Sequence, residues 1–180
     1  MKLFTIGHSS HSWEKFVRLL EDNGISLLVD VRSAPYSRYH PQFNGSNLET
    51  ALPQRSIDYA FAGQYLGGRP SDPSCYKSRR LPAEGADYLH EVDYPEVMKR
   101  EWFVKGIERL LELADEQLTA ILCSEENPAE CHRHHLIAKY LQAEHPEVKV
   151  VHIRGDGAVF GAESIRTSLD EAEAEQLSLL

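Results

Sequence analysis

The apolar positions of the chain form short continuous runs separated by amphipathic segments. Residues 2–6 are one such run, and residues 26–32 are a second, which is typical of a strand buried on both faces. Between them, the apolar residues recur at helical spacing from Ser12, a good N-cap, to Gly24, which suits a helix end. A strand, a helix and a strand within about 30 residues predict a right-handed βαβ unit with parallel strands.

The next part of the chain has weaker patterns. Residues 33–45 are rich in Pro, Ser, Asn and Gly and are predicted to be a long loop, which in compact domains is often functional. Residues 47–54 favour a short helix, and residues 57–62 favour a third strand. Residues 63–95 hold several prolines and no clear period, so we expect a long irregular insertion there.

The pattern becomes regular again in the second half. From about Pro95 to Ala114 the apolar residues trace one face of a long helix. Residues 119–123 form an apolar strand that runs into an amphipathic helix over residues 127–141. Residues 148–153 predict a further strand, which ends at Arg154–Gly157, and residues 164–180 predict a C-terminal helix docked on the domain.

These elements predict an α/β fold: a single domain over residues 1–180, with a mostly parallel sheet flanked by helices and a long irregular insertion around residues 63–95. The 180 residues, 42% hydrophobic and 26% charged, fit one ordinary globular domain. The N-terminal apolar run is too short for a signal peptide, and no run reaches the roughly 20 residues of a membrane span. We therefore expect a cytoplasmic protein without a membrane partner.

Charge and cysteine content narrow the function. The net charge of −9 argues against a basic surface for sequence-independent nucleic-acid binding. Seven arginines nevertheless lie in or beside predicted loops, so a basic pocket in an acidic body is one reading, and solvated or structurally paired arginines are the other. They are Arg32, Arg38, Arg69, Arg79, Arg80, Arg133 and Arg154. The odd number of cysteines, three, fits reduced thiols rather than a disulfide framework.

Polar side chains follow four of the predicted strands at the point where each strand ends. In open α/β sheets, ligands bind in the crevice outside the carboxyl ends of the strands. The sequence therefore predicts that these side chains converge on one site. They are His8 and Ser9, Asp30 and Arg32, Cys123 and Glu125, and His152 and Arg154.

The helix expected over residues 127–141 carries an arginine on its buried face. Asn127 and Pro128 are good first residues for this helix. At about 100° per residue, Arg133 falls within the apolar stripe and should point inward. A buried guanidinium needs a partner, either a protein carboxylate or the anionic group of a ligand. Asp30, at the end of an apolar strand, either caps the next turn or acts as a ligand or base.

Cysteines and histidines crowd the start of this helix, but their spacing is poor for a metal. A structural zinc site has paired ligands in two separate knuckles, and a second pair is missing. The helical wheel also places Cys131, His134 and His135 on the exposed face, so we predict no metal and no cofactor. Cys123 faces a helix start, where a thiolate can be stabilised, but neighbouring glutamates oppose this, and the alternative is a small buried apolar residue.

Five motifs together resemble the bacterial and archaeal domain-of-unknown-function family four-eight-eight. They are Thr5-Ile-Gly-His-Ser9, Leu28-Val-Asp-Val-Arg-Ser-Ala-Pro-Tyr-Ser-Arg38, Pro41-Gln-Phe43, Leu66-Gly-Gly68 and Leu122-Cys-Ser-Glu-Glu-Asn-Pro-Ala-Glu-Cys-His-Arg133. The resemblance implies a compact cytoplasmic α/β protein without a settled activity. It also implies a functional set that includes Cys131, in conflict with the wheel: His8, Ser9, Asp30, Arg32, Ser37, Arg38, Glu125, Cys131, His132 and Arg133.

A weaker resemblance is to rhodanese and cysteine-phosphatase folds, in which a strand, a cysteine loop and an arginine lead into a helix. Nine residues separate Cys123 from Arg133, where a phosphatase loop has five, and the loop is acidic and lacks glycine. A cysteine-dependent activity with Cys123 or Cys131 as nucleophile is therefore kept only as a second alternative.

The leading hypothesis is an enzyme, a hydrolase or transferase, whose partner is a small anionic ligand: a phosphorylated molecule, a nucleotide or a nucleic-acid end. The candidates for acid–base catalysis are His8, Asp30, Glu125 and His132. The candidates for ligand binding are Ser9, Arg32, Ser37, Arg38 and Arg133. The first alternative is a non-enzymatic regulatory or interaction module that binds through the insertion at residues 63–95.

Overall fold

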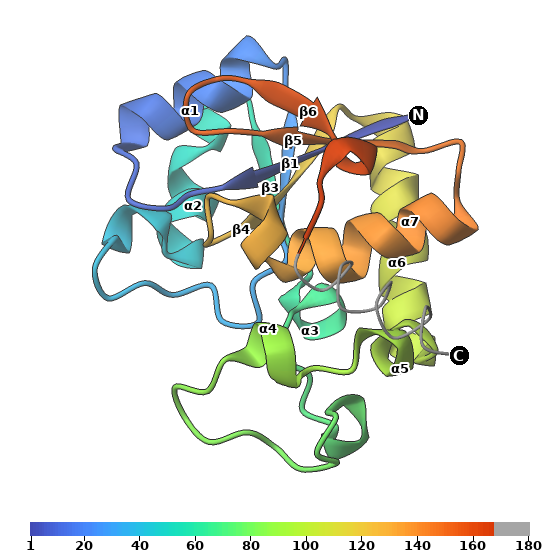
Figure 1. The fold of residues 1–180 in the computed structure, drawn as a ribbon. Helices are drawn as coiled ribbons and strands as arrows, with labels where there is room; N and C mark the ends of the chain where they lie inside the picture. The colour runs from blue at the N-terminus through green and yellow to red at the C-terminus, as the bar shows by residue number, and fades with distance from the viewer. Residues whose placement is uncertain (168–180) are drawn as a thin grey trace.

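Strands from both ends of the chain join in one six-stranded sheet, in the order β3-β2-β4-β1-β5-β6. The computed structural model describes residues 1–167, so the helix expected at residues 164–180 falls almost wholly outside the described residues. The first five strands are parallel and β6 is antiparallel to β5 (Figure 1). The strands are β1 Lys2–Gly7, β2 Leu27–Asp30, β3 Asp58–Phe61, β4 Thr119–Cys123, β5 Lys149–Ile153 and β6 Val159–Gly161.

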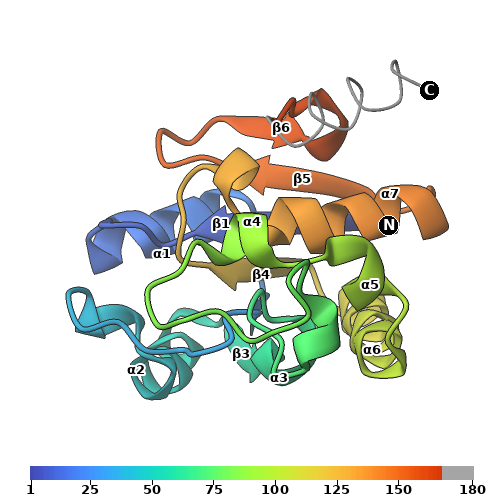
Figure 2. The ribbon, with the colours of Figure 1, turned by 60° about the horizontal axis from the view of Figure 1, so that its bottom comes forward.

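Helices cover both faces of the sheet, which confirms the expected α/β class. The α-helices are α1 Trp13–Asp22, α2 Gly45–Ala51, α3 Gly63–Leu66, α4 Tyr88–Glu91, α5 Tyr94–Met98, α6 Glu101–Glu116 and α7 Lys139–Glu144. Apolar residues of α1 and α2 pack on one face, and those of α6 and α7 on the other (Figures 1 and 2). None of the helices in residues 1–167 combines the length and the apolar character that crossing a membrane requires.

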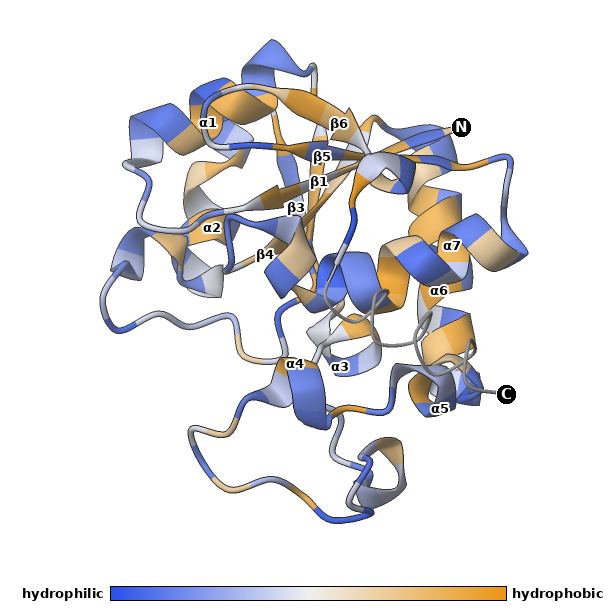
Figure 3. Cartoon of the chain, viewed as in Figure 1, coloured by the Kyte–Doolittle hydropathy of each residue, from blue (hydrophilic) through white to orange (hydrophobic). Residues whose placement is uncertain are grey.

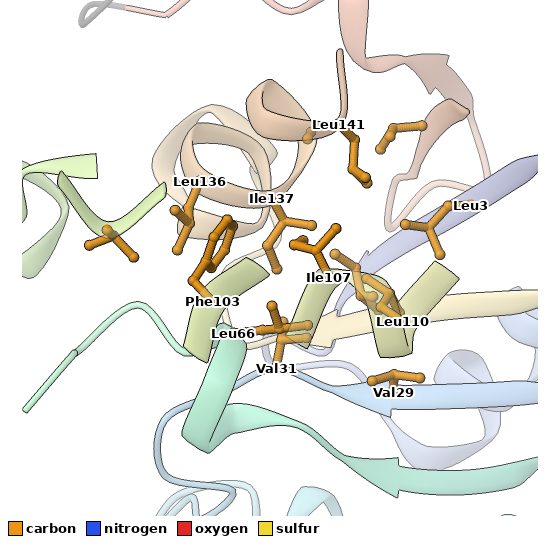
Figure 4. Packing of buried hydrophobic residues seen from close by; sticks show 14 of the residues in the cluster. Leu3, Val29, Val31, Leu66, Phe103, Ile107, Leu110, Leu136, Ile137 and Leu141 are labelled. Atoms are coloured by element: carbon orange, nitrogen blue, oxygen red, sulfur yellow. The ribbon is translucent and has the colours of Figure 1, made fainter. Parts of the chain in front are cut away.

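Strand β2 shows why its sequence is continuously apolar. Leu27 and Val29 belong to the cluster under α6, whereas Leu28 belongs to the cluster under α1. Successive side chains of a strand point to opposite faces, and both faces of this strand are covered. The apolar residues, orange in Figure 3, accordingly gather where the helices meet the sheet. Figure 4 shows the larger cluster, in which Ile137 and Leu141 lie on one side of the interior and Ile107 of α6 faces them from the other.

The prediction of one continuous helix from about Pro95 to Ala114 is wrong. It is divided into α5 and α6, because Lys99 ends α5 and Arg100 is extended, at φ −78° and ψ 132°. The side chain of Arg100 donates to Ser74 Oγ at 2.7 Å, in the insertion. Val97 and Phe103, on either side of the break, still reach the same core cluster. The apolar pattern therefore predicted the buried face but not the break.

The expected helix over residues 127–141 is also interrupted, and this changes which side chains are buried. Asn127 does cap a first turn, Pro128–Glu130, through Ala129 N, but this turn is a 3₁₀ helix and Cys131 after it is extended, at φ −140° and ψ 140°. A π-helix, Arg133–Ala138, then leads into α7. Because the phase restarts after Cys131 and the winding is wider, a single α-helical wheel does not apply.

The exposed positions expected for Cys131, His134 and His135 are therefore wrong. Their exposed fractions are 1%, 2% and 2%.

The rest of the chain is compact but irregular. Between α3 and α5 the insertion contains a 3₁₀ turn, Pro73–Cys75, the short helix α4 and a single antiparallel bridge between Tyr76 and Val92. Both bridge residues are buried in the larger core cluster. After β5, the turn at Arg154–Gly157 leads into the unexpected strand β6, with Gly157 at φ +90°. A glycine tolerates this left-handed conformation without strain.

A buried histidine gives the fold a dependence on pH. The ring of His152, on β5, bonds Thr5 Oγ1 through Nδ1 at 2.7 Å, and its Nε2 lies 3.2 Å from His134 Nδ1. Burial lowers the pKa of His152 from 6.5 to about 3, so the unfolded chain binds a proton that the folded chain resists. Its contribution to stability is fully present above pH 6.5 and is lost as the pH falls from 6.5 towards 3.

We expect His152→Gln to flatten this part of the curve of unfolding free energy against pH, measured with urea, although the variant will be less stable overall. His90→Gln is the control, because the side chain of His90 is 51% exposed. Equal slopes for His152→Gln and wild type between pH 6.5 and 3 would contradict the assignment.

Candidate functional site

A cavity of about 720 Å³ lies at the carboxyl edge of β2 and β4. One part of its lining follows β2, and a second part follows β4. The insertion at residues 63–95, green in Figure 2, supplies the third part. The charged, thiol, imidazole and aromatic side chains of the lining are Arg32, Tyr36, Arg69, Asp87, Tyr88, His90, Tyr94, Cys123, Glu125, Glu130, Cys131 and His132.

Two thiols, an imidazole and a carboxylate form a compact cluster on this lining. The Cys123 thiol donates to Glu125 Oε2 at 3.0 Å, and the Cys131 thiol donates to the same oxygen at 3.2 Å. His132 Nδ1 lies 3.5 Å from Cys123 Sγ and 3.9 Å from Cys131 Sγ. On its other side, His132 Nε2 lies 3.2 Å from the carbonyl oxygen of Val31. Cys123, Cys131 and His132 thus offer donor atoms that could hold a metal ion.

The buried cluster shifts the pKa of each of its members. Burial raises the pKa of the Cys123 thiol well above its ordinary value and also raises the pKa of the Glu125 carboxyl. Burial acts in the same sense on Cys131, but the hydrogen bond with Cys123 and the charges of Arg133 and His132 outweigh it and lower its pKa well below 9. Burial lowers the pKa of His132, but Cys131 reverses this shift and raises it.

Arg133 points inward, as predicted, and is fully buried. Its partners are not the carboxylate or ligand anion that the sequence suggested. Nη1 donates to the carbonyl oxygen of Glu125, Nη2 donates to that of Glu126 at 2.7 Å, and Nε donates to Thr5 Oγ1 at 3.2 Å. Arg133 therefore holds the loop that follows β4 against β1.

Asp30 caps the turn after β2 and also pairs with an arginine. Its Oδ1 accepts from Arg32 N at 3.1 Å and from Arg32 Nε at 2.9 Å, and its Oδ2 accepts from Arg32 Nη2 at 2.6 Å. Tyr59 donates to Oδ2 at 3.0 Å, and Arg32 Nη2 also donates to the Phe43 carbonyl at 2.8 Å. Arg32 Nη1 is buried and finds no hydrogen-bond partner within residues 1–167. Arg32 is also one of the residues that line the cavity.

The structure brings only some of the predicted site residues together. His8 lies under the loop after β2, where its ring stacks on Phe43 at 4.6 Å and Nδ1 bonds Ser9 O at 2.8 Å. Burial lowers the pKa of His8 to about 4. Ser9 N donates to Ser124 O at 2.8 Å, so it supports the loop after β4.

Ser37 and Arg38 lie farther along the loop after β2. Ser37 Oγ accepts from His40 N at 3.1 Å, and Arg38 is exposed. Within the predicted set, the cavity therefore collects Arg32, Cys123, Glu125, Cys131 and His132.

Sequence reasoning missed the wall of the cavity that the insertion supplies. Arg69 lies over the ring of Tyr88, with its guanidinium carbon 4.6 Å from the ring centre. The one available signal was the glycine pair before it. A Cβ added at Gly68 would lie 2.6 Å from Cγ of His132, so only a glycine lets the imidazole approach this closely.

The fold and the site define an α/β protein with a ligand-sized cavity and a thiol, imidazole and carboxylate cluster at the carboxyl edge of a mostly parallel sheet. A family model described as Domain of unknown function DUF488 matches residues 12–141, and the chain belongs to this family. Comparison with curated proteins and with solved structures finds no match. The matched region includes the loop after β2, the insertion and the cluster.

The pair of Asp30 and Arg32 predicts a large effect on stability. Both side chains are buried, with exposed fractions of 0% and 3%, and Asp30→Asn would leave a buried guanidinium without its countercharge. We expect a loss of about 3–5 kcal/mol in the free energy of unfolding, measured with urea.

The matched control is Glu21→Gln, which removes the partner of Arg55 from an exposed pair, with exposed fractions of 48% for Arg55 and 40% for Glu21. That change should stay within about 1 kcal/mol. Similar losses for the two variants would show that Asp30 is not needed to keep Arg32 in place.

Proposed function

We propose that the protein is an enzyme that binds a small anionic substrate in the cavity and transforms it at the cluster of Cys123, Glu125, Cys131 and His132. The observation that carries this proposal is Arg32, whose side chain is buried on the cavity lining with Nη1 still unpartnered within residues 1–167. A buried cationic donor without an acceptor is costly, and an anionic ligand supplies the acceptor.

A second guanidinium supports an anionic substrate. Arg69 lies on the same lining, and its contact with Tyr88 orients it without neutralising it. Guanidinium groups match the oxygens of phosphate or carboxylate in bidentate geometry. The volume of about 720 Å³ is within the usual range for small-molecule sites. A phosphorylated small molecule or nucleotide, or the end of a nucleic acid, is the substrate class that we favour.

The proposed roles differ from those expected from sequence. Arg32 and Arg69 bind the anion, in place of Arg38 and Arg133. Glu125 is the group of the cluster suited to proton transfer, because it lines the cavity and its pKa is raised in the folded protein. His132, which the sequence also suggested for this role, is held beside it by the Val31 carbonyl. Asp30 acts by positioning Arg32, since it bonds the guanidinium at two atoms. Hydrolysis or transfer of a phosphoryl group is the reaction class that these roles support.

Two features weigh against the alternatives. An interaction module that binds through the insertion does not need motif residues on the lining of a cavity, which is where Arg32, Glu125 and His132 lie. A cysteine-phosphatase loop binds phosphate with its backbone amides, but here the carbonyls of Glu125 and Glu126 are held by Arg133. The cysteine-dependent reading therefore lacks the anion-binding loop that it requires.

The test is binding of pyrophosphate and nucleoside monophosphates by isothermal titration calorimetry. We expect Arg69→Gln to weaken the best of these ligands by about tenfold or more, because it removes a charge-assisted contact. Arg55→Gln is the control, since Arg55 is an exposed arginine paired with Glu21. Equal affinities for wild type and both variants, or no binding of any of these anions by wild type, would refute the proposed site.

A further inference from the structure

We propose that Cys123, Cys131 and His132 bind one divalent transition metal ion of the zinc type, with the carboxylate of Glu125 as fourth ligand. This inference deepens the proposed function, because it names what the cluster contributes to the reaction. The binding of the ion rests on the geometry of the cluster alone. Only its part in catalysis rests on the proposed function.

The separations of the donor atoms are close to those of a tetrahedral site. With zinc–sulfur bonds of about 2.3 Å and zinc–nitrogen bonds of about 2.0–2.1 Å, a tetrahedron places a sulfur about 3.5 Å from the nitrogen. Cys123 Sγ lies 3.5 Å and Cys131 Sγ 3.9 Å from His132 Nδ1. The donor atoms of these three residues lie within 4.8 Å of one another.

The Glu125 carboxylate supplies the fourth ligand, on the side of the cluster that faces the cavity. Glu125 Oε2 lies 3.0 Å from Cys123 Sγ and 3.2 Å from Cys131 Sγ, against about 3.5 Å for a sulfur and an oxygen on one tetrahedral zinc. Both contacts are hydrogen bonds from thiols, which bring the heavy atoms closer than a shared metal would. A shift of a few tenths of an ångström along flexible side chains converts one arrangement into the other.

The protein holds the imidazole in the orientation that a ligand needs. A carbonyl oxygen only accepts, so the bond between His132 Nε2 and Val31 O at 3.2 Å places the ring proton on Nε2. In the neutral ring, Nδ1 is then unprotonated and turns its lone pair towards the two sulfurs. Metal-binding histidines usually donate their other N–H in this way, which fixes the tautomer. The ring also packs on Gly68, which keeps it from turning away.

Proton and charge balance are straightforward. A divalent ion displaces the protons of the two thiols, and two thiolates, a carboxylate and the ion sum to one negative charge. The guanidinium of Arg133 is close enough to both cysteines to favour their thiolate forms electrostatically. A positive charge therefore lies next to the negatively charged metal site. A water molecule or a substrate oxygen can replace Glu125 as the fourth ligand, because Glu125 lines the cavity. At that position the ion would polarise an anionic substrate or activate a water molecule.

The ligand pattern explains why the sequence did not show the site. Cys123 closes a strand, and Cys131 and His132 follow a loop and a 3₁₀ turn, so the two cysteines are eight positions apart. The common zinc knuckles bring ligands from a tight turn two to four residues apart. Here the approach depends on the extended backbone at Cys131, which no helical period predicts.

The test is titration of the reduced, metal-free full chain with Zn²⁺ by calorimetry, and with Co²⁺ by absorption spectroscopy. We expect one ion per chain and a thiolate-to-cobalt charge-transfer band. Cys123→Ala and Cys131→Ala should each weaken binding by at least about a hundredfold, and Gly68→Ala by about tenfold, because it displaces the imidazole but keeps every ligand. Cys75→Ala is the control: Cys75 is also a buried free thiol, but it lies in the insertion.

The inference is overturned if reduced wild type takes up no ion, if Cys123→Ala and Cys131→Ala bind as wild type does, or if Cys75→Ala abolishes binding. Circular dichroism checks that each variant folds.

Arg69→Gln should bind Zn²⁺ as wild type does, because Arg69 is not one of the proposed metal ligands. Metal binding without anion binding would refute the proposed function alone, and anion binding without metal binding would refute the metal site alone.

Discussion

The site depends on one fully buried guanidinium. Arg133 donates to two consecutive carbonyl oxygens, of Glu125 and Glu126, and to the hydroxyl of Thr5. A buried charge without such acceptors would be unstable, so the chain after β4 is fixed in the one path that presents them. The same path brings Glu125 O against Gly7, where an added Cβ would collide with it. β1, the loop after β4 and the π-helix are thereby joined.

Because Arg133 fixes the loop after β4, the carboxylates of the neighbouring Glu125 and Glu126 make different contacts. With its carbonyl held, Glu125 directs its carboxylate between the two sulfurs, at 3.0 and 3.2 Å. Glu126 turns the other way and pairs with Arg154, at 2.9 and 2.8 Å, and with Gly155 N at 2.8 Å. Those charged contacts lower the pKa of Glu126 to about 2. One carboxylate therefore supports the turn after β5, and the other belongs to the cavity.

The sequence predicted the sheet well, because strand burial and helix spacing leave direct traces in the order of apolar residues. Ser12 caps α1 through Lys15 N and Gly24 is left-handed after it, as expected. The parallel order also pointed to the carboxyl edge of the sheet, where the cavity lies, but His8, Ser9, His152 and Arg154 do not line it. The sequence did not predict the two helix breaks. Arg100 leaves the helix where its side chain bonds Ser74 in the insertion, and Cys131 is extended between a 3₁₀ turn and a π-helix. Neither break has a periodic signature in the sequence.

The cavity wall was unpredictable for a related reason. Residues 63–95 fold as short helical segments and a single bridge, fixed by packing on the core rather than by local preference. Arg69 and Tyr88 therefore could not be assigned to the site from their spacing. The cluster, in contrast, was recognisable as a dense group of reactive residues, but the helical wheel placed Cys131 on the exposed face. The extended residue at Cys131 reverses that conclusion.

Crystals grown with Zn²⁺ and pyrophosphate would test the central claim most directly, by anomalous diffraction at the zinc absorption edge. The account predicts one strong peak within about 2.3 Å of the sulfurs of Cys123 and Cys131, next to His132 Nδ1, and an anion between Arg32 and Arg69. A peak elsewhere in the chain, with the two sulfurs unligated, would contradict it.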